Sequence, residues 1–187
     1  MCVQAELVHR ARRGDREAFS VLAGAAVDRL YAVARLILRD ADLAQDATQE
    51  ALVRAWRDLP TLRDVERFDA WLYRVTVRAC SDMRKARQRW RSELTIVGTE
   101  PSELDRSAAL ADRDELERGL RRLSDSQRTI LVLTYYLGFS QGDVAEALDI
   151  PVGTAKSRLH YAIEALRAAL AADARSTTGA AAEGRTA

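Results

Sequence analysis

The chain has 187 residues, of which 48% are hydrophobic, 30% charged and 6% aromatic, and its formal net charge is +1. This length allows one domain or two small ones, and a composition rich in Ala, Leu, Arg, Asp and Glu is typical of a helical protein. The near-neutral charge excludes a uniformly basic surface for nucleic acid. No apolar stretch approaches the ~20 residues of a membrane-spanning helix and no secretory leader opens the chain, so we expect a cytoplasmic protein.

Residues that bind metals or carry out catalysis are few. The two cysteines, Cys2 and Cys80, lie far apart, and they form no zinc-binding spacing with His9 and His160. There is no glycine-rich phosphate-binding loop and no Ser, His and Asp pattern typical of a hydrolase. We therefore expect no catalytic site, no metal and no cofactor, and we predict that Cys80 is a small buried residue.

Three helical patterns come first in the chain. Residues 5–13 predict a short helix that Gly14 closes, and residues 15–38 predict a longer one. Asp42 is expected to cap the third helix and Pro60 to end it. The apolar positions of that third helix are Leu43, Ala47, Ala51 and Ala55.

One face of the third helix is polar and acidic. Its members follow the spacing i, i+3, i+4 and i+7, which places them on the same side of a helix. Carboxylates repel DNA but accept charge-assisted hydrogen bonds from an arginine-rich protein surface. The alternative is a plain solvated face, and the residues alone favour neither. The members of this acidic face are Asp46, Gln49, Glu50 and Val53.

A fourth helix is predicted from about residue 69 to residue 90, with an apolar side and a basic side. Basic residues that follow a backbone, beside aromatic residues that stack on bases, suit single-stranded nucleic acid. The alternative is that Phe68 and Trp71 anchor the core and that the charges are simply solvated. The candidates for nucleic-acid contact are Phe68, Trp71, Arg74, Arg78, Lys85 and Arg89.

The charge then changes, since residues 91–117 hold three basic and eight acidic residues. The first part of this segment has no helical period, which indicates a linker. The chain end is rich in Ala, Thr, Gly, Ser and charge, which is typical of disorder. We predict an all-α protein with a helical domain at residues 1–91, a flexible acidic linker at 92–111, a second helical domain at 112–171 and a disordered tail at 172–187.

The second domain contains the pattern of a helix-turn-helix. Ser140 is expected to cap a helix over residues 141–148, and Thr154 to cap the next helix after a tight turn. The second helix begins with basic and polar side chains, as in helices whose N-terminus enters the DNA major groove. The alternative is an ordinary helical hairpin with a solvated face. The candidates for DNA contact are Thr154, Lys156, Ser157, Arg158, His160 and Tyr161.

The predicted helices, the acidic linker and the helix-turn-helix, in this order along the chain, resemble bacterial sigma factors of the sigma-70 family, extracytoplasmic-function (ECF) subfamily. Their core-polymerase-binding helix is similar to D-A-T-Q-E-A-L-V-R-A-W at residues 46–56. Their promoter-melting helix is similar to F-D-A-W-L-Y-R-V at 68–75, followed by S-D-M-R-K at 81–85. Their fourth region is similar to L-S-D-S-Q-R-T-I-L-V-L at 123–133 and P-V-G-T-A-K-S-R-L-H-Y-A at 151–162.

The resemblance implies a transcription initiation factor without catalytic activity that binds core RNA polymerase, directs it to promoters and melts promoter DNA. The acidic face would contact the clamp helices of the largest polymerase subunit. The fourth helix would recognise the minus-ten element, and the helix from Thr154 would read the minus-thirty-five element. Many relatives are held inactive by an anti-sigma factor, which is a further partner that the resemblance brings in.

Three positions depart from the family pattern. Arg78 stands where Asn is common, Tyr161 where Arg is common, and Gly142 where Glu is frequent in the first helix of the helix-turn-helix. The glycine costs that helix up to ~1 kcal/mol. The promoter sequence therefore does not follow from family averages. The competing interpretation is a stand-alone helix-turn-helix regulator with an N-terminal sensor or dimerisation domain, which would not need the acidic face.

Overall fold

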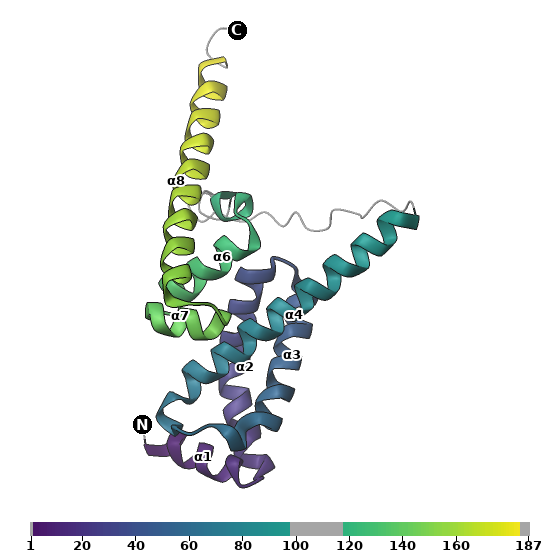
Figure 1. The fold of residues 1–187 in the computed structure, drawn as a ribbon, viewed down its shortest axis with the longest axis vertical. Coiled ribbons are helices and arrows are strands. Elements are labelled where there is room, and N and C mark those ends of the chain that lie inside the picture. The colour runs from purple at the N-terminus through teal and green to yellow at the C-terminus, as the bar shows by residue number, and fades with distance from the viewer. Residues whose placement is uncertain (1, 98–117, 184–187) are drawn as a thin grey trace. The chain divides into compact units, whose positions relative to one another are not determined.

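The structure is a computed structural model that describes residues 2–97 and 118–183, with side chains described over 3–90 and 118–172. Over these ranges the chain is helical without strands, which confirms the predicted all-α class. It divides into two compact units, one built on α1 to α4 and one on α6 to α8 (Figure 1). None of the described helices has an apolar stretch long enough to cross a membrane.

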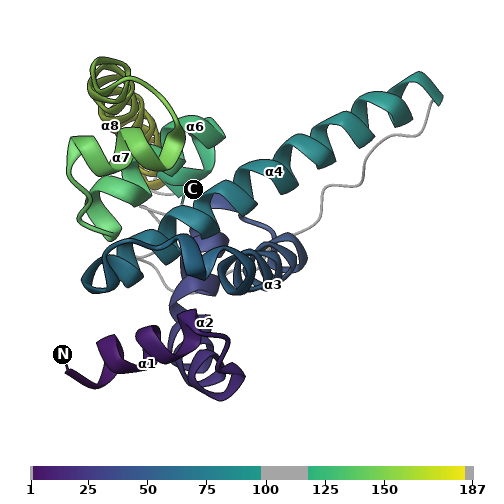
Figure 2. The ribbon, with the colours of Figure 1, turned by 60° about the horizontal axis from the view of Figure 1, so that its bottom comes forward.

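The N-terminal unit is a bundle in which α3 packs against both α2 and α4, while α1 lies at one end (Figure 2). Short 3-10 turns join α3 to α4, and α1 packs against them. The described elements are α1 (Cys2–Arg12), α2 (Arg16–Leu38), α3 (Ala41–Asp58), η1 (Leu59–Thr61), η2 (Val65–Arg67) and α4 (Phe68–Val97).

The centre of the bundle depends on small side chains along α3. Ala47, Ala51 and Ala55 are fully buried, as the sequence predicted, and so is Ala44, while Leu43 is only partly buried. Alanines three and four positions apart leave room for neighbouring helices to approach closely, so α3 fits between α2 and α4. Larger side chains from the neighbouring helices fill the core; those with almost no exposure include Leu30, Val33, Ile37, Leu72, Val77 and Cys80.

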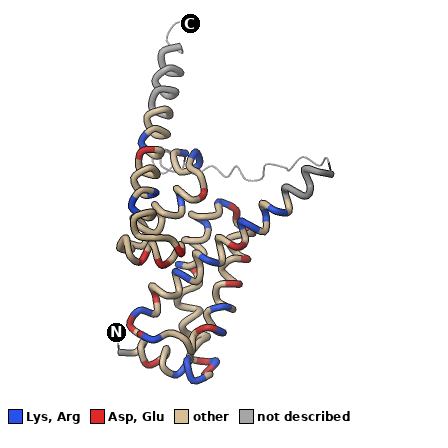
Figure 3. Tube along the Cα trace, viewed as in Figure 1, with Lys and Arg blue, Asp and Glu red and all other residues tan. Residues whose placement is uncertain are grey.

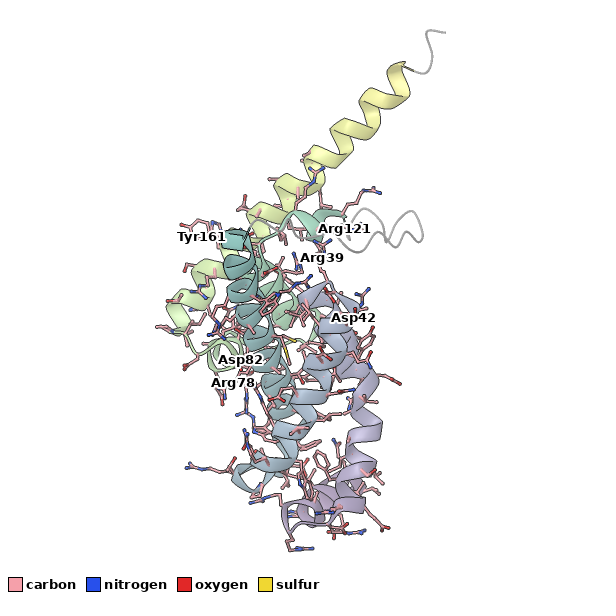
Figure 4. The ribbon with its side chains drawn as sticks, turned by 90° about the vertical axis from the view of Figure 1, so that its right-hand side faces the viewer. Arg39, Asp42, Arg78, Asp82, Arg121 and Tyr161 are labelled. Atoms are coloured by element: carbon pink, nitrogen blue, oxygen red, sulfur yellow. The ribbon has the colours of Figure 1, made fainter. Side chains whose placement is uncertain are left out.

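The junction of α2 and α3 corrects one prediction, because Asp40 and not Asp42 caps α3. Asp40 has an extended backbone, and its carboxylate accepts a hydrogen bond from the Leu43 N–H at 3.0 Å. The preceding residue, Arg39, takes the left-handed conformation with a φ of 57° and ends α2. Asp40 also forms an ion pair with Arg87 of α4. Figure 4 shows Arg39 and Asp42 at this junction.

Asp40 is expected to stabilise the bundle through its charge. Burial by itself raises the pKa of Asp40, but hydrogen bonds from Leu43 and Arg87 outweigh it and leave the pKa below its usual value. A lowered pKa means stability that is present above about pH 4 and is lost as the pH falls through the pKa of the folded protein. Because the ion pair is partly exposed and screened, Asp40→Asn should cost only about 0.5–1 kcal/mol at pH 7.

Urea unfolding of Asp40→Asn and the wild-type chain at pH 7 and pH 3 measures this effect, and the difference should shrink at pH 3. Asn is as good a helix cap as Asp, so the substitution removes the charge but keeps the cap. Asp42→Asn is the matched control, since Asp42 is an exposed carboxylate two residues further along α3. An equal loss of stability in both variants would contradict the role given to Asp40.

Helix α4 is longer than predicted. It continues to Val97, seven residues past Trp90, because no glycine or proline occurs before Gly98. Its first half packs into the bundle, but Met83 is only partly buried and Ala86 and Trp90 are exposed. The helix was predicted correctly, but its apolar side is buried only over the first half of its length. Most of the predicted linker lies outside the described residues.

The C-terminal unit is held together by packing of α6 on α8. Ser140 caps α7 as predicted: its Oγ accepts from the Asp143 N–H at 3.2 Å, and Asp143 accepts in return from the Ser140 N–H. Ser124 and Gln127 form a second capping box at the start of α6. The elements are α6 (Asp125–Leu131), the π-helical turn η3 (Val132–Tyr136), α7 (Gln141–Leu148) and α8 (Val152–Glu183).

The turn between α7 and α8 corrects the predicted start of the second helix. Asp149 takes the left-handed conformation, with a φ of 53°, and the Ile150 N–H donates to Ala145 O at 3.0 Å, which closes α7. Helix α8 then begins at Val152, and Pro151 O accepts from the Ala155 N–H at 3.0 Å. Thr154 therefore lies inside the first turn and does not cap the helix.

The far end of α8 also differs from the prediction. The helix continues to Glu183, whereas the sequence predicted a disordered tail from residue 172. Alanine, the best helix former, recurs through this stretch, and no proline interrupts it. Residues 184–187 lie outside the described residues.

Candidate functional site

The acidic face lies on the side of α3 opposite its alanine stripe. Asp46 and Gln49 are exposed, Val53 is 63% exposed, and Glu50 is partly buried. The predicted members therefore share one accessible surface. Within the described residues, Asp46 and Gln49 form no hydrogen bond that would keep them from an incoming partner.

Glu50 differs from the other members because a cation from its own helix holds it. Arg54 Nε donates to Glu50 Oε1 at 2.7 Å, and Arg54 Nη1 donates to Asp82 Oδ2 of α4 at 2.6 Å. The hydrogen bond to Asp82, followed by that to Glu50, raises the pKa of Arg54. Neither Arg54 nor Asp82 was among the predicted site residues. The i, i+4 spacing of Glu50 and Arg54 was a visible signal, whereas Asp82 comes from another helix.

Basic residues recur along α4 (Figure 3). Arg78, Lys85 and Arg89 are exposed, as a contact with nucleic acid requires. Arg74 lies on the same helix, and its contact with nucleic acid stays a prediction.

The aromatic residues at the start of α4 are part of the core. Phe68 is 2% exposed and packs in one cluster with Leu22, Leu59 and Leu72. Trp71 is partly buried against the same cluster, and the two ring centroids lie 6.0 Å apart. This burial favours the alternative that Phe68 anchors the core. Two aromatic side chains of α4 were not among the predicted contacts: Tyr73, which packs partly buried against the same cluster, and Trp90, which is 63% exposed.

The start of α8 presents the predicted polar surface. Ala155 and Ala162 face the core with no exposure, and the other side carries exposed polar and basic groups. The Ser157 hydroxyl donates to Thr154 O at 3.1 Å, and the rings of His160 and Tyr161 stack edge to face at 5.7 Å. Figure 4 shows Tyr161 on this helix. The exposed residues are Lys156, Ser157, Arg158, His160 and Tyr161, while Thr154 is partly buried.

The described side chains contain no group of three or more His, Cys, Asp or Glu that could hold a metal ion. Cys80 is fully buried, as predicted, and burial raises the pKa of its thiol to about 12. A thiol with this pKa stays protonated near neutral pH and is a poor nucleophile.

Comparisons with known proteins identify the class. The family description "Sigma-70 region 2" matches residues 22–91, and "Sigma-70, region 4" matches residues 113–166. The RNA polymerase sigma-H factor of Pseudomonas aeruginosa is 32% identical over 178 residues, which are 88% of this chain and 92% of the relative. The ECF RNA polymerase sigma factor SigL of Mycobacterium tuberculosis is 36% identical over 149 residues, 75% of this chain and 82% of the relative.

A solved structure agrees with these matches. The sigma factor RpoE in complex with the anti-sigma factor NepR, from Bartonella quintana, superposes with a TM-score of 0.66 at 25% identity, over 83% of this chain and 98% of that one. Fold and sequence together thus define a sigma factor of RNA polymerase. The chain belongs to the sigma-70 family, and its relatives place it in the ECF subfamily. It is a transcription initiation factor that binds core RNA polymerase and directs it to promoter DNA.

Proposed function

We propose that three surfaces divide the work of initiation between them. The acidic face of α3 docks on core polymerase, the basic residues of α4 act at the minus-ten element, and the start of α8 reads the minus-thirty-five element. The observation that carries this proposal is the exposure of the acidic face opposite the buried alanine stripe of α3. A stand-alone regulator of DNA would not need this face, because carboxylates repel DNA.

The residue assignments follow from exposure. For docking we propose Asp46, Gln49, Glu50 and Val53, and for the minus-ten element Arg78, Lys85 and Arg89, with Trp71 contributing its exposed part. Phe68 is too buried for direct contact with DNA, whereas Arg74 stays among the proposed contacts of the minus-ten element. For the minus-thirty-five element we propose Lys156, Ser157, Arg158, His160 and Tyr161, together with the partly buried Thr154.

The domain roles follow the same division. Residues 1–91 form the domain for polymerase and the minus-ten element, residues 112–171 form the domain for the minus-thirty-five element, and residues 92–111 join them. The chain acts in the cytoplasm and has no enzymatic activity of its own. Because the sigma factor RpoE of Bartonella quintana forms a complex with an anti-sigma factor, we also propose an anti-sigma factor as a partner of this chain.

Substitutions in α8 test the function. In holoenzyme reconstituted from core polymerase, Lys156→Ala and Arg158→Ala should each weaken binding to a minus-thirty-five-dependent promoter fragment by about ten-fold or more. A base contact contributes about 1–3 kcal/mol, and a phosphate contact changes the salt slope by about one. Fluorescence anisotropy at two salt concentrations separates these cases. Affinity for core polymerase should not change, since neither residue lies on the acidic face.

Arg167→Ala is the matched control for charge. Arg167 is another exposed cation of α8, and it pairs with Glu164 at 2.6 Å, two turns beyond the proposed contact surface. Its substitution should leave promoter binding close to that of the wild type. Unchanged promoter affinity in both test variants would remove α8 from recognition, and failure of the wild-type chain to bind core polymerase would contradict the whole assignment.

A further inference from the structure

The acidic face contains one side chain whose position is already fixed. Glu50 is bound by Arg54, and Arg54 is itself bound by Asp82 across the α3–α4 interface. The Arg54 side chain is 25% exposed, whereas those of Glu50 and Asp82 are 38% and 51% exposed. The guanidinium is therefore more buried than the two carboxylates it joins, and it holds both through short charge-assisted hydrogen bonds.

This arrangement leaves Glu50 available to a partner. Arg54 occupies the Oε1 atom of the carboxylate, and among the described residues Oε2 accepts no hydrogen bond. A carboxylate accepts several hydrogen bonds, so the second oxygen can receive a donor from another protein. A glutamate that is already held loses less side-chain entropy when the partner binds than a freely rotating one does.

Resting on the proposed docking role of the acidic face, we propose that Arg54 is a positioning residue for polymerase binding. Arg54 would touch no polymerase group itself. Anchored by Asp82, it holds Glu50 in one orientation, so that the carboxylate meets its donor without first being ordered. Asp82 thus contributes to docking from a different helix, although it lies outside the acidic face.

A second effect of Arg54 opposes the first. Its positive charge reduces the attraction between the acidic face and an arginine-rich partner, so removing it adds one net negative charge to the face. If charge dominated, Arg54→Ala would bind core polymerase more tightly. The Arg54 charge is already paired with the carboxylates of Glu50 and Asp82, so little of it acts on a partner, and we expect the loss of orientation to have the larger effect.

The experiment is a double-mutant cycle on the full-length chain, with affinity for core polymerase measured by fluorescence anisotropy. Arg54→Ala should weaken binding about five-fold and Glu50→Ala about ten-fold, a range typical of ordered polar contacts. The double variant should bind like Glu50→Ala, because Arg54 acts only through Glu50. Asp82→Asn should weaken binding in the same direction as Arg54→Ala, while Arg54 itself stays in place.

Arg29→Ala is the control for a loss of interhelical ion pairing alone. Arg29 of α2 pairs with Asp69 of α4 at 3.4 Å, and both side chains are at least 42% exposed. This variant should bind core polymerase like the wild type. Thermal melts of every variant show whether the bundle remains folded at the temperature of the assay.

Three results would overturn the positioning role: wild-type affinity in Arg54→Ala, tighter binding in Arg54→Ala, or a further loss when Arg54→Ala is added to Glu50→Ala. The docking proposal fails separately. If Asp46→Arg and Glu50→Ala both keep wild-type affinity, the acidic face does not dock. If those two weaken binding and Arg54→Ala does not, only the role of Arg54 is wrong.

Discussion

Phe68→Ala is expected to lower the free energy of unfolding of the N-terminal unit by about 3–5 kcal/mol. The Phe68 ring is 2% exposed and packs with buried leucines from α2 and α4, so truncation leaves a cavity that the helices cannot fill. Tryptophan fluorescence during urea unfolding reports on this unit, because all three tryptophans, Trp56, Trp71 and Trp90, belong to it.

Phe68→Leu separates the core role of Phe68 from contact with a base. Leucine keeps most of the apolar volume, so this variant should lose less than about 1.5 kcal/mol and should still open promoters when bound to core polymerase. Permanganate reactivity of unpaired thymines measures that opening. A Phe68→Leu protein that is stable but does not open promoters would show that the ring contacts DNA, contrary to its burial.

Asp46→Arg is expected to reduce affinity for core polymerase by about 100-fold. The substitution places a cation opposite a partner surface that we propose to be rich in arginine. Like charges that face each other across an interface cost several kcal/mol. A loss of about 3 kcal/mol corresponds to the 100-fold change in affinity. Asp46 is exposed on α3, so the fold should tolerate the change. Titration of fluorescent sigma factor with core polymerase measures the affinity directly.

The control for charge reversal is Asp28→Arg. Asp28 is an exposed aspartate of α2 in the same unit, so this variant changes the net charge equally without altering the acidic face. It should bind core polymerase within about two-fold of the wild type, as expected for a screened charge away from the contact. Equal losses in both variants would mean that total charge, and not the acidic face, governs binding.

Local patterns predicted much of the fold. The alanine stripe of α3 and the cap at Ser140 involve residues three or four positions apart, and such spacing is visible in the sequence. The choice between Asp40 and Asp42 was different, because it depends on the left-handed backbone of Arg39 and on Arg87, which lies 47 positions away. A cap prediction that considers one helix alone cannot include that contact.

The candidate surfaces also differ in whether they depend on local sequence spacing or on contacts between distant residues. The exposed side of α8 follows from the helical period of its apolar residues, and the structure leaves Lys156 and Arg158 exposed as expected. The burial of Phe68 was harder to predict from the sequence. Phe68 is the first residue of α4, so no preceding helical turn indicates which side of the helix it lies on. The position of Glu50 depends on Asp82, and that contact exists only once α3 and α4 have packed together.

The buried thiol of Cys80 has a practical consequence for measuring motion in this bundle. Because its side chain has no exposure and its pKa is raised to about 12, an alkylating reagent reacts with it only when the helices separate. In a chain with Cys2 replaced by Ser, the rate of alkylation therefore gives the free energy of opening under native conditions. The native Cys80 thiol therefore reports the local opening of the bundle where α4 packs into the core, and no cysteine has to be introduced for the measurement.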